Sequence, residues 1–274
     1  GGDLHSAHAG ADCALTVDGR PVPPRSTAIL RDGQTAEIGS ARSGTFAYLA
    51  VAGGFSIPPQ LGSLSLHLRS RMGGLDGRPL RANDRLECRE ASHSGPQLHH
   101  PADIAQDDGP IRVMLGPQDD YFTPEAIRVF LESEFIVSPQ ADRMGFQLTG
   151  PTLAHAKGFN IVSDGIVEGH IQVPGSGQPI ILMRDRQTAG GYPKIATVIS
   201  ADLDRLAQVR PGSPVRFRAV ERGEAVAAAR AFNTWVEALP AALVPVRSTP
   251  TTEDLLAANL IDGAVHALDP SFPE

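Results

Sequence analysis

The sequence predicts a mainly β protein with a few helices. Three observations support this prediction. Aromatic residues make up only 5% of the chain, Gly and Pro are abundant with 28 and 23 copies, and many short alternating runs are separated by Gly, Pro, Asn or Asp. Such runs are typical of strands joined by turns. With 274 residues, the chain is long enough to bury a sizeable core in one large domain or two smaller ones.

The first part of the chain is predicted to form a β unit followed by a linker. Residues 42–55 form a predicted strand that ends at a Gly-Gly pair, and residues 84–88 form another. Residues 91–110 show almost no apolar periodicity and are rich in Ser, Gly, Pro, His and Asp, a composition typical of linkers. We therefore predict three regions: an N-terminal β unit over 1–92, a linker over 93–110 and a C-terminal unit over 111–274.

The C-terminal unit begins with a predicted strand and a predicted helix. The strand covers residues 111–116 and the helix covers 123–133. Thr123 is the expected N-cap, and Pro124 suits the first helical position because its missing N–H would have no partner there.

Three further helices are predicted. One covers residues 200–208 with Ser200 as its cap, and a longer one covers about 221–238. The apolar stripe of the longer helix is formed by Val226, Ala229, Phe232 and Trp235. A short helix in the tail is predicted between Thr252 and Gly263.

Residues 178–200 contain the most informative pattern. Two β-prone runs, QPIILMRDRQTA and YPKIATVIS, flank Gly190 and Gly191. A two-residue Gly-Gly loop predicts a hairpin because the favoured turns need positive φ. Opposed residues of a hairpin point to the same side of the sheet. One face is then expected to carry Asp185, Gln187, Tyr192 and Lys194.

This polar face permits two interpretations. In the first, it is a solvated hairpin surface with an Asp185–Lys194 pair on a diagonal, which would contribute little energy. In the second, it binds a neutral, amide-like or ureido substrate. The Gln187 amide would hydrogen-bond another amide, Lys194 would hold a carboxylate or an oxyanion, and Tyr192 would donate or pass a proton. The residues alone leave both interpretations open.

Two further pairs are candidates for substrate binding. Asp142 and Arg143 lie in a predicted turn beside a strand, where a surface ion pair is the alternative. His170 and Gln172 lie on one face of a predicted strand, where each is more often a satisfied sheet residue than part of a site.

Composition argues against several classes of function. The net charge of −7, with no run of Lys or Arg, disfavours nucleic acid and membrane surfaces as partners, and no segment approaches ~20 uninterrupted apolar residues. Two isolated cysteines, Cys13 and Cys88, predict a reducing compartment, with cytoplasm as the default. The nine histidines lack metal-ligand spacing, so we predict no metal site, and the sequence has no GxxxxGK[ST] phosphate loop.

Three stretches resemble the biotin-dependent carboxyltransferase family. They cover residues 48–68, 138–151 and 163–217, and the strings QT-x-GGYPKI and IQVP-x-x-GQPI are the most specific part. The family includes allophanate hydrolase subunit 2 proteins, the C subunit of the ATP-dependent bacterial 5-oxoprolinase and the carboxyltransferase region of urea carboxylase. The resemblance implies two cyclophilin-like β-barrel units.

The resemblance also implies a function. It suggests a subunit of a cytoplasmic heteromeric amidohydrolase, most like the 5-oxoprolinase C subunit, that acts on a small amide, lactam or urea. The expected partner is a homologous protein of the 5-oxoprolinase B type or the allophanate hydrolase subunit 1 type. ATP is expected at the level of the complex, and biotin only in the urea carboxylase branch. The alternatives are a carboxyltransferase or allophanate hydrolase component of urea degradation, and a regulatory binder of a kinase-inhibitor-type partner.

The resemblance favours site roles for the residues of the predicted hairpin. In similar proteins this region lies near the substrate cleft, which implies catalytic roles for Gln187, Tyr192 and Lys194. Asp185 would then position Lys194, and Gln172 would help to orient the amide.

Three departures from the family pattern accompany the resemblance. Ala189 stands where Thr is usual, and His170 stands where a small residue is usual, which implies an altered cleft. The usual opening segment, with its Gln-Asp-x-Gly-Arg string, has no counterpart. We therefore expect the first β unit to be incomplete.

Overall fold

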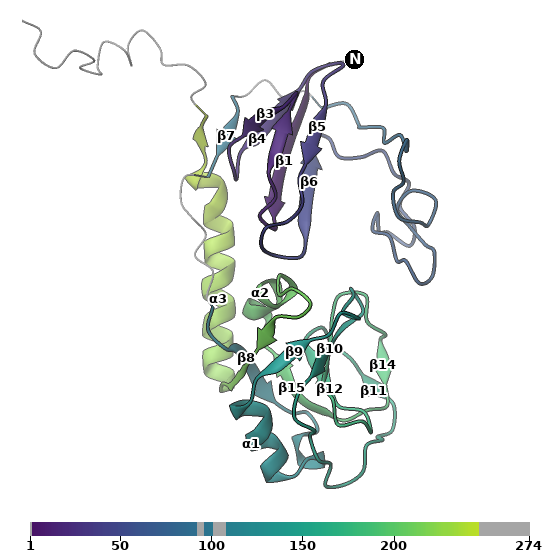
Figure 1. The fold of residues 1–274 in the computed structure, drawn as a ribbon, viewed down its shortest axis with the longest axis vertical. Coiled ribbons are helices and arrows are strands. Elements are labelled where there is room, and N and C mark those ends of the chain that lie inside the picture. Colours follow the sequence, from purple (N-terminus) through teal and green to yellow (C-terminus); the bar gives the residue numbers. More distant parts are fainter. Residues whose placement is uncertain (1, 92–95, 101–107, 247–274) are drawn as a thin grey trace, which may run out of the picture.

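The computed structural model describes residues 2–91, 96–100 and 108–246. Figure 1 shows two β-rich units, with helix α3 (Arg222–Ala238) extending from the C-terminal unit towards the N-terminal one. The prediction of a mainly β chain with a few helices is confirmed. In the described part of the chain, no helix is long and apolar enough to cross a membrane.

The N-terminal unit contains two three-stranded antiparallel sheets, in the orders β4-β1-β6 and β3-β2-β5. The strands are β1 (Leu4–Gly10), β2 (Leu15–Val17), β3 (Arg20–Val22), β4 (Thr27–Leu30), β5 (Ala36–Ile38) and β6 (Ala47–Val51). Strand β6 lies inside the predicted 42–55 strand, and Gly53 and Gly54 follow it with φ of 76° and 74°. Among the described residues of this unit, the buried apolar side chains are those of Ala11, Leu15 and Ala28.

An arm of turns follows β6 and covers residues 52–91. The strand predicted over 84–88 is wrong, because here only Cys88 forms a bridge, an isolated one with Phe55. The Asp84 carboxylate accepts hydrogen bonds from the Arg78 guanidinium at 2.8 and 2.9 Å and from the Arg81 N–H at 2.6 Å. These contacts fix a turn at the point where the predicted strand would begin.

The C-terminal unit is a nearly closed, barrel-like sheet in the order β16-β9-β10-β13-β12-β15-β8-β17. Its strands are β8 (Ile111–Leu115), β9 (Phe135–Val137), β10 (Gly145–Thr149), β12 (His170–Gln172), β13 (Ile180–Leu182), β15 (Lys194–Val198), β16 (Pro214–Val215) and β17 (Phe217–Ala219). All neighbours are antiparallel except β17, which runs parallel to β8. Strand β8 matches the predicted 111–116 strand.

Two short pairs complete the strands. Strand β11 (Asp164–Gly165) pairs with β14 (Ala189–Gly190), and β7 (Leu98–His99) pairs with β18 (Val244–Pro245). Strand β7 lies within the predicted linker, so this segment joins the end of the described chain through a small ladder.

The helix predicted over 123–133 is confirmed as α1 (Pro124–Glu132), with Thr123 as its N-cap. The Thr123 hydroxyl accepts a hydrogen bond from the Ala126 N–H at 3.1 Å, which satisfies one of the donors left free in the first helical turn. Three short 3-10 helices are present in the described residues: η1 (Asp119–Tyr121), η2 (Ser200–Asp202) and η3 (Leu239–Ala242).

The other helix predictions are confirmed only in part. The 200–208 segment is helical as η2 followed by α2 (Leu203–Ala207), but neither helix has a side-chain cap, so the predicted cap at Ser200 is wrong. Helix α3 matches the predicted 221–238 helix, although it buries no residue fully, and Trp235 is 40% exposed. The predicted tail helix lies outside the described residues.

The predicted hairpin around Gly190 and Gly191 is wrong. Strand β12 lies between β13 and β15 in the sheet, so each of these strands pairs with β12 and not with the other. After β13 the chain leaves the sheet, and the pair β11–β14 holds Gly190 against Asp164. Neither glycine has a positive φ, so the turn chemistry assumed for them does not apply.

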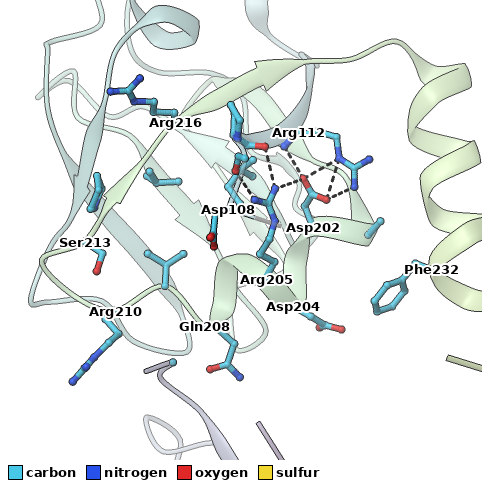
Figure 2. Close-up of a pocket in the computed structure, with 18 of the residues that line it drawn as sticks. Asp108, Arg112, Asp202, Asp204, Arg205, Gln208, Arg210, Ser213, Arg216 and Phe232 are labelled. Atoms are coloured by element: carbon cyan, nitrogen blue, oxygen red, sulfur yellow. Dashed lines mark hydrogen bonds and ion pairs between the residues drawn. The ribbon is translucent and has the colours of Figure 1, made fainter. Parts of the chain in front are cut away.

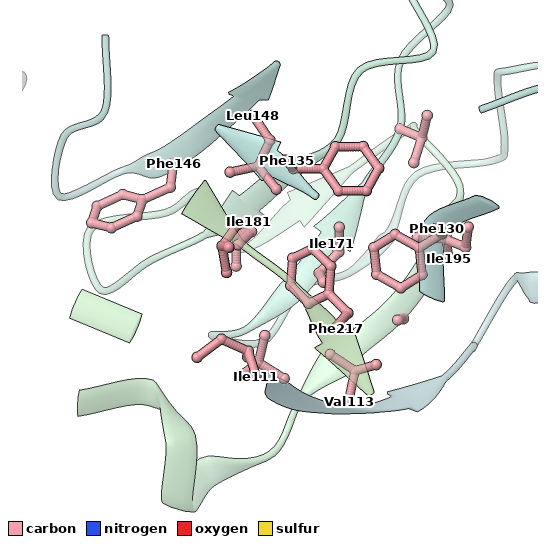
Figure 3. Packing of buried hydrophobic residues seen from close by; sticks show 14 of the residues in the cluster. Ile111, Val113, Phe130, Phe135, Phe146, Leu148, Ile171, Ile181, Ile195 and Phe217 are labelled. Atoms are coloured by element: carbon pink, nitrogen blue, oxygen red, sulfur yellow. The ribbon is translucent and has the colours of Figure 1, made fainter. Parts of the chain in front are cut away.

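The core lies inside the C-terminal sheet and under α1 (Figure 3). Phe130 of α1 is fully buried and stacks on Phe217 of β17 with ring centroids 4.6 Å apart, and Phe135 lies 6.1 Å from both rings. These aromatic contacts join the helix to two strands from opposite ends of the sheet order. Burial of such side chains is the main favourable contribution to the stability of this unit.

The side-chain amide of Gln208 joins the two units. Its Oε1 accepts hydrogen bonds from the N–H groups of Thr45 at 2.8 Å and Phe46 at 3.1 Å, and its Nε2 donates to the Phe46 carbonyl at 3.0 Å. Arg210 adds a hydrogen bond from Nη1 to the Arg42 carbonyl at 3.1 Å. The junction therefore includes polar contacts that satisfy backbone groups of the N-terminal unit.

Leu206→Ala tests the position of the core. Leu206 of α2 is fully buried, so the substitution is expected to lower the free energy of unfolding by about 2–5 kcal/mol through lost burial and a residual cavity. The matched control is Leu80→Ala in the arm, where the side chain is 62% exposed and the expected change is within about 0.5 kcal/mol. Urea denaturation measures both, and equal losses would contradict the core assignment.

Candidate functional site

A buried lysine lies at the centre of the candidate site. Lys194 begins β15, and its side chain is fully buried. Its Nζ donates to Oδ2 of Asp164 in β11 at 2.7 Å, and the Asp164 side chain is 52% exposed. A buried ammonium group is tolerated only when it is paired. The pair therefore presents a carboxylate to solvent with a cation behind it.

Gln118 completes this contact. Its Nε2 donates to Oδ2 of Asp164 at 3.2 Å, and its Oε1 accepts from the Lys194 N–H at 3.2 Å. The Gln118 N–H donates to the Lys194 carbonyl at 3.0 Å. This glutamine thus ties the start of β15 to the carboxylate that Lys194 binds. We call Lys194, Asp164 and Gln118 the lysine cluster.

Asp164 is ionised at neutral pH. Hydrogen bonds from Lys194, from the Gly165 N–H at 2.8 Å and from Gln118 lower the pKa of its carboxyl group. A carboxylate with this environment accepts hydrogen bonds well and holds a proton poorly.

His170 lies in β12 beside the lysine cluster and is uncharged at neutral pH. Burial lowers the pKa of its imidazole to about 4, and the positive charges of Lys194 and Arg186 act in the same direction, while Asp164 opposes them. The His170 Nδ1 accepts from the Val167 N–H at 3.2 Å, which assigns the ring proton to Nε2.

Two glutamine amides meet above Gly190. A Cβ atom on this glycine would lie 2.8 Å from Nε2 of Gln172 and 3.5 Å from Nε2 of Gln187. The same atom would lie 2.6 Å from Cδ1 of Ile166. Glycine is therefore required here for close approach, which is a different reason from the predicted positive φ.

The structure brings several of the predicted site residues together. Gln172 is buried in β12 and its Nε2 donates to the Tyr192 carbonyl at 3.4 Å, while the Tyr192 side chain is 41% exposed. Gln172, Gln187, His170, Tyr192 and Lys194 thus gather around β12, β14 and β15, although the predicted hairpin does not position them.

The remaining predicted site residues, Asp142, Arg143 and Asp185, lie in a second group of contacts. Arg143 donates to Oδ1 of Asp185 at 2.9 Å, to Oγ of Ser65 at 3.2 Å and to the Leu66 carbonyl at 3.2 Å. The predicted contact between Asp185 and Lys194 is wrong, because each has a different partner.

This second group joins the arm to the C-terminal unit. Asp142 binds the Arg69 guanidinium at 3.2 Å, and Arg143 holds Ser65 and Leu66. Both contacts link residues more than 70 positions apart in sequence. The long-range side-chain contacts of Asp142 and Arg143 are therefore with the arm and with Asp185, while Asp142 also accepts hydrogen bonds from the N–H groups of Met144 and Gly145.

Sequence reasoning missed Asp164 and Gln118. Asp164 stands in the Ser-Asp-Gly string, where a turn is the simplest interpretation, and it lies 30 positions from Lys194. Gln118 follows β8 and is 76 positions from Lys194. The available indication was that Lys194 would need an acidic partner. The spacing of the acids along the sequence does not identify which of them binds it.

A hollow lies away from the lysine cluster. It has a volume of about 1250 Å³ and is lined by residues of β8, α2, β16 and α3 and by Gly44 of the N-terminal unit. In Figure 2 the buried Asp202 carboxylate binds the Arg112 N–H at 2.7 Å, Arg112 Nη2 at 2.6 Å and Arg205 Nη2 at 3.0 Å. Burial would raise the pKa of Asp202, but these hydrogen bonds lower it overall. The wall of this hollow carries acids and arginines that bind each other.

Within the described residues, no group of three or more His, Cys, Asp or Glu side chains is placed to hold a metal ion.

Residues 1–219 match the family described as carboxyltransferase domain, subdomain A and B. The chain belongs to this family. The predicted resemblance is therefore confirmed.

The carboxyltransferase relatives include proteins named as subunits. The chain is 38% identical over 223 residues to the C subunit of 5-oxoprolinase from Haemophilus influenzae, covering 81% of this chain and 72% of the relative. It is 35% identical over 230 residues to the C subunit of 5-oxoprolinase from Escherichia coli, covering 84% and 74%. Urea amidolyase of Saccharomyces cerevisiae is 30% identical over 230 residues, which cover 76% of this chain and 12% of that protein.

Two solved structures share the fold. The protein TTHA0988 superposes with a TM-score of 0.70 at 35% identity, covering 79% of this chain and 42% of that chain. Urea amidolyase of Kluyveromyces lactis superposes with a TM-score of 0.76 at 23% identity, covering 91% and 17%. The chain thus spans less than half the length of these two proteins.

Gly190→Ala tests the close packing of the site. The added methyl group would collide with Ile166 and Gln172, so a loss of about 1–3 kcal/mol in the free energy of unfolding is expected. Gly165→Ala is the matched control in the paired strand β11, where a Cβ meets open space. Chemical denaturation compares the two variants, and a neutral Gly190→Ala would contradict the geometry of the site.

The buried neutral His170 predicts a loss of stability in acid. Because the pKa in the folded state, about 4, lies below the ordinary value of 6.5, the unfolded chain binds the proton more readily between these values. This contribution to stability is present above pH 6.5 and is lost as the pH falls towards 4, by roughly 3 kcal/mol.

The measurement is the free energy of unfolding from pH 7.5 to 4, compared between the natural chain and His170→Gln. The variant lacks this titrating group, so its stability is expected to fall less steeply through this range. Parallel pH dependences for the two proteins would show that His170 does not titrate in this way.

Proposed function

We propose that this chain is the C subunit of an ATP-dependent 5-oxoprolinase and takes part in opening 5-oxoproline to glutamate. The observation that carries the proposal is the similarity to two proteins named as the C subunit of 5-oxoprolinase, at 38% and 35% identity over more than 70% of each. In the overall reaction, water adds across the C–N bond of the lactam to give a carboxylate and an amine. The coupled hydrolysis of ATP gives ADP and phosphate.

The lysine cluster and the side chains gathered beside it supply the polar groups for this chemistry. Asp164 is ionised and half exposed, so it is suited to accept a hydrogen bond from the lactam N–H. The amides of Gln172 and Gln187 are suited to orient the lactam carbonyl, because an amide can both donate and accept. Tyr192 keeps its predicted role in assisting proton transfer.

Lys194 takes a different role from the predicted one. Its ammonium group is fully buried behind Asp164, so we assign it as a positioning residue that holds the Asp164 carboxylate ionised and in place. Gln118 acts in the same way from the other side. Asp185 is assigned to the junction with the arm, through Arg143.

The remaining components belong to the complex. Relatives named as subunits imply other subunits, and we propose a homologous subunit of the B type as the partner. The sequence has no GxxxxGK[ST] phosphate loop, and the described residues contain no metal-ligand group that could help to hold ATP, so we assign no ATP step to this chain. The cysteine content favours the cytoplasm as the compartment.

A urea-type reaction is the second candidate. It is favoured by the 30% identity to urea amidolyase of S. cerevisiae. That reaction would need a biotin carrier and a carboxylase from other chains, and we derive no step through biotin.

The proposal is tested by reconstitution. The chain is combined with the other subunits of the E. coli 5-oxoprolinase, and glutamate formation from 5-oxoproline is followed with and without ATP. The expected result is glutamate only when ATP and this chain are both present. Failure of the chain to replace the E. coli C subunit, while that subunit restores activity in the same assay, rejects the proposal, and turnover of urea in a parallel assay would favour the second candidate.

Asp164→Asn tests the lysine cluster within that complex. The loss of a charge-assisted hydrogen bond to the substrate is expected to lower kcat/KM by about 10- to 100-fold. The matched control is Asp120→Asn, which removes the carboxylate from an exposed pair with Lys157. Unchanged turnover by Asp164→Asn, at normal complex assembly, would remove Asp164 from the site.

The pH dependence of kcat/KM in the same assay tests the positioning role of Lys194. Without the ammonium group the pKa of Asp164 rises, so in Lys194→Met the acidic limb of kcat/KM is expected to move to higher pH. A purely structural loss would lower the rate without moving this limb.

A further inference from the structure

Arg186 has hydrogen-bond donors that no group among the described residues uses. It follows the turn after β13, where its N–H donates to the Met183 carbonyl at 3.2 Å. Its Nη1 donates to the Arg184 carbonyl at a long 3.4 Å, and its Nε is buried without a partner among the described residues. The side chain is half-buried and forms no ion pair with an acid of the described chain.

The acids near Arg186 are already occupied. Asp185, its neighbour in sequence, binds Arg143 at 2.9 Å. Asp164 binds Lys194 at 2.7 Å and Gln118 at 3.2 Å. The cationic charge of Arg186 is therefore not compensated by either carboxylate.

Arg186 differs from the neighbouring arginines, which each bind a carboxylate. Arg143 uses its donors on Asp185, Ser65 and Leu66. Arg184 is exposed and binds Glu168 at 2.9 Å. In this part of the described structure, Arg186 is the guanidinium that lacks a carboxylate.

The charged side chains that act on His170 carry a net positive charge. Lys194 and Arg186 both lower the pKa of the imidazole, and Asp164 opposes them. Two cations thus face one anion, within a chain whose net charge is −7. A local positive excess next to a half-exposed cluster attracts an anionic ligand.

We propose that Arg186 binds the carboxylate of the substrate and forms a carboxylate subsite beside the amide-binding glutamines. This inference rests on the proposed function and names the class of substrate: a small lactam with a carboxylate next to the ring nitrogen. The planar guanidinium offers parallel N–H donors that match the two oxygens of a carboxylate.

The neighbourhood of Arg186 fits such a ligand. Gln187 follows it directly in the sequence, and the amides of Gln187 and Gln172 meet over Gly190. In 5-oxoproline the carboxylate is bonded to the carbon next to the lactam nitrogen, so the two groups need recognition by adjacent side chains. A carboxylate bound at the Nη groups would also provide acceptors for guanidinium donors that the described residues leave unused.

The test uses two lactams that differ only in the carboxylate. Binding of 5-oxoproline and of 2-pyrrolidinone to the assembled complex is measured by titration calorimetry for the natural chain and for Arg186→Ala. The natural chain is expected to prefer 5-oxoproline, and Arg186→Ala is expected to bind it about 10- to 100-fold more weakly, with no change for 2-pyrrolidinone. Arg184→Ala, two positions away on an exposed side chain, is the matched control and keeps the preference.

The outcomes separate the subsite from the function. If Arg186→Ala retains the preference for 5-oxoproline, or if the natural chain shows none, the carboxylate subsite is overturned. If glutamate forms normally and the KM for 5-oxoproline is unchanged in Arg186→Ala, the proposed function survives and the subsite does not. If the preference depends on Arg186 but no glutamate forms, the subsite survives and the proposed reaction does not.

Discussion

The candidate site depends on the burial of one ammonium group. Lys194 is fully enclosed at the start of β15, and an unpaired charge in that position would cost far more than any neighbouring packing contact could return. Asp164 is therefore held at 2.7 Å, and Gln118 is held against both of them. The paired strands β11 and β14, the closely packed Gly190 and the neutral His170 all lie around the contact between Lys194 and Asp164.

Local chemistry in the sequence predicts some of the local structure, although the strand over 84–88 and the cap at Ser200 are wrong. The Thr123-Pro124 start of α1 and strand β8 were found because the relevant contacts lie within a few residues. The hairpin at Gly190 failed because β12, which precedes β13 in the sequence, inserts between β13 and β15. Glycine pairs indicate a bend of the chain, but they do not indicate which strand will occupy the position beside it.

The sequence predicts only part of the residues of the candidate site, because Asp164 and Gln118 are missed, and it does not predict their contacts. The polar string from Asp185 to Lys194 points to the region around β14 and β15 where the structure gathers several polar side chains, and the family resemblance points to the same region. The partners were not predictable, because Lys194 meets an acid 30 positions away and Asp185 meets an arginine 42 positions away. The order of the strands in the sheet decides which charged side chains meet. A single sequence with many acids does not specify that order.

The contrast between the two units has a consequence for how the chain unfolds. The C-terminal unit contains a cluster of buried aromatic and aliphatic side chains, whereas in the described N-terminal unit the buried apolar side chains are Ala11, Leu15 and Ala28. Cooperative units with little buried apolar area open at lower free energy than the core of the molecule. We therefore expect the N-terminal sheets to depend on contacts such as those of the Gln208 amide for their order, and to open before the C-terminal sheet does.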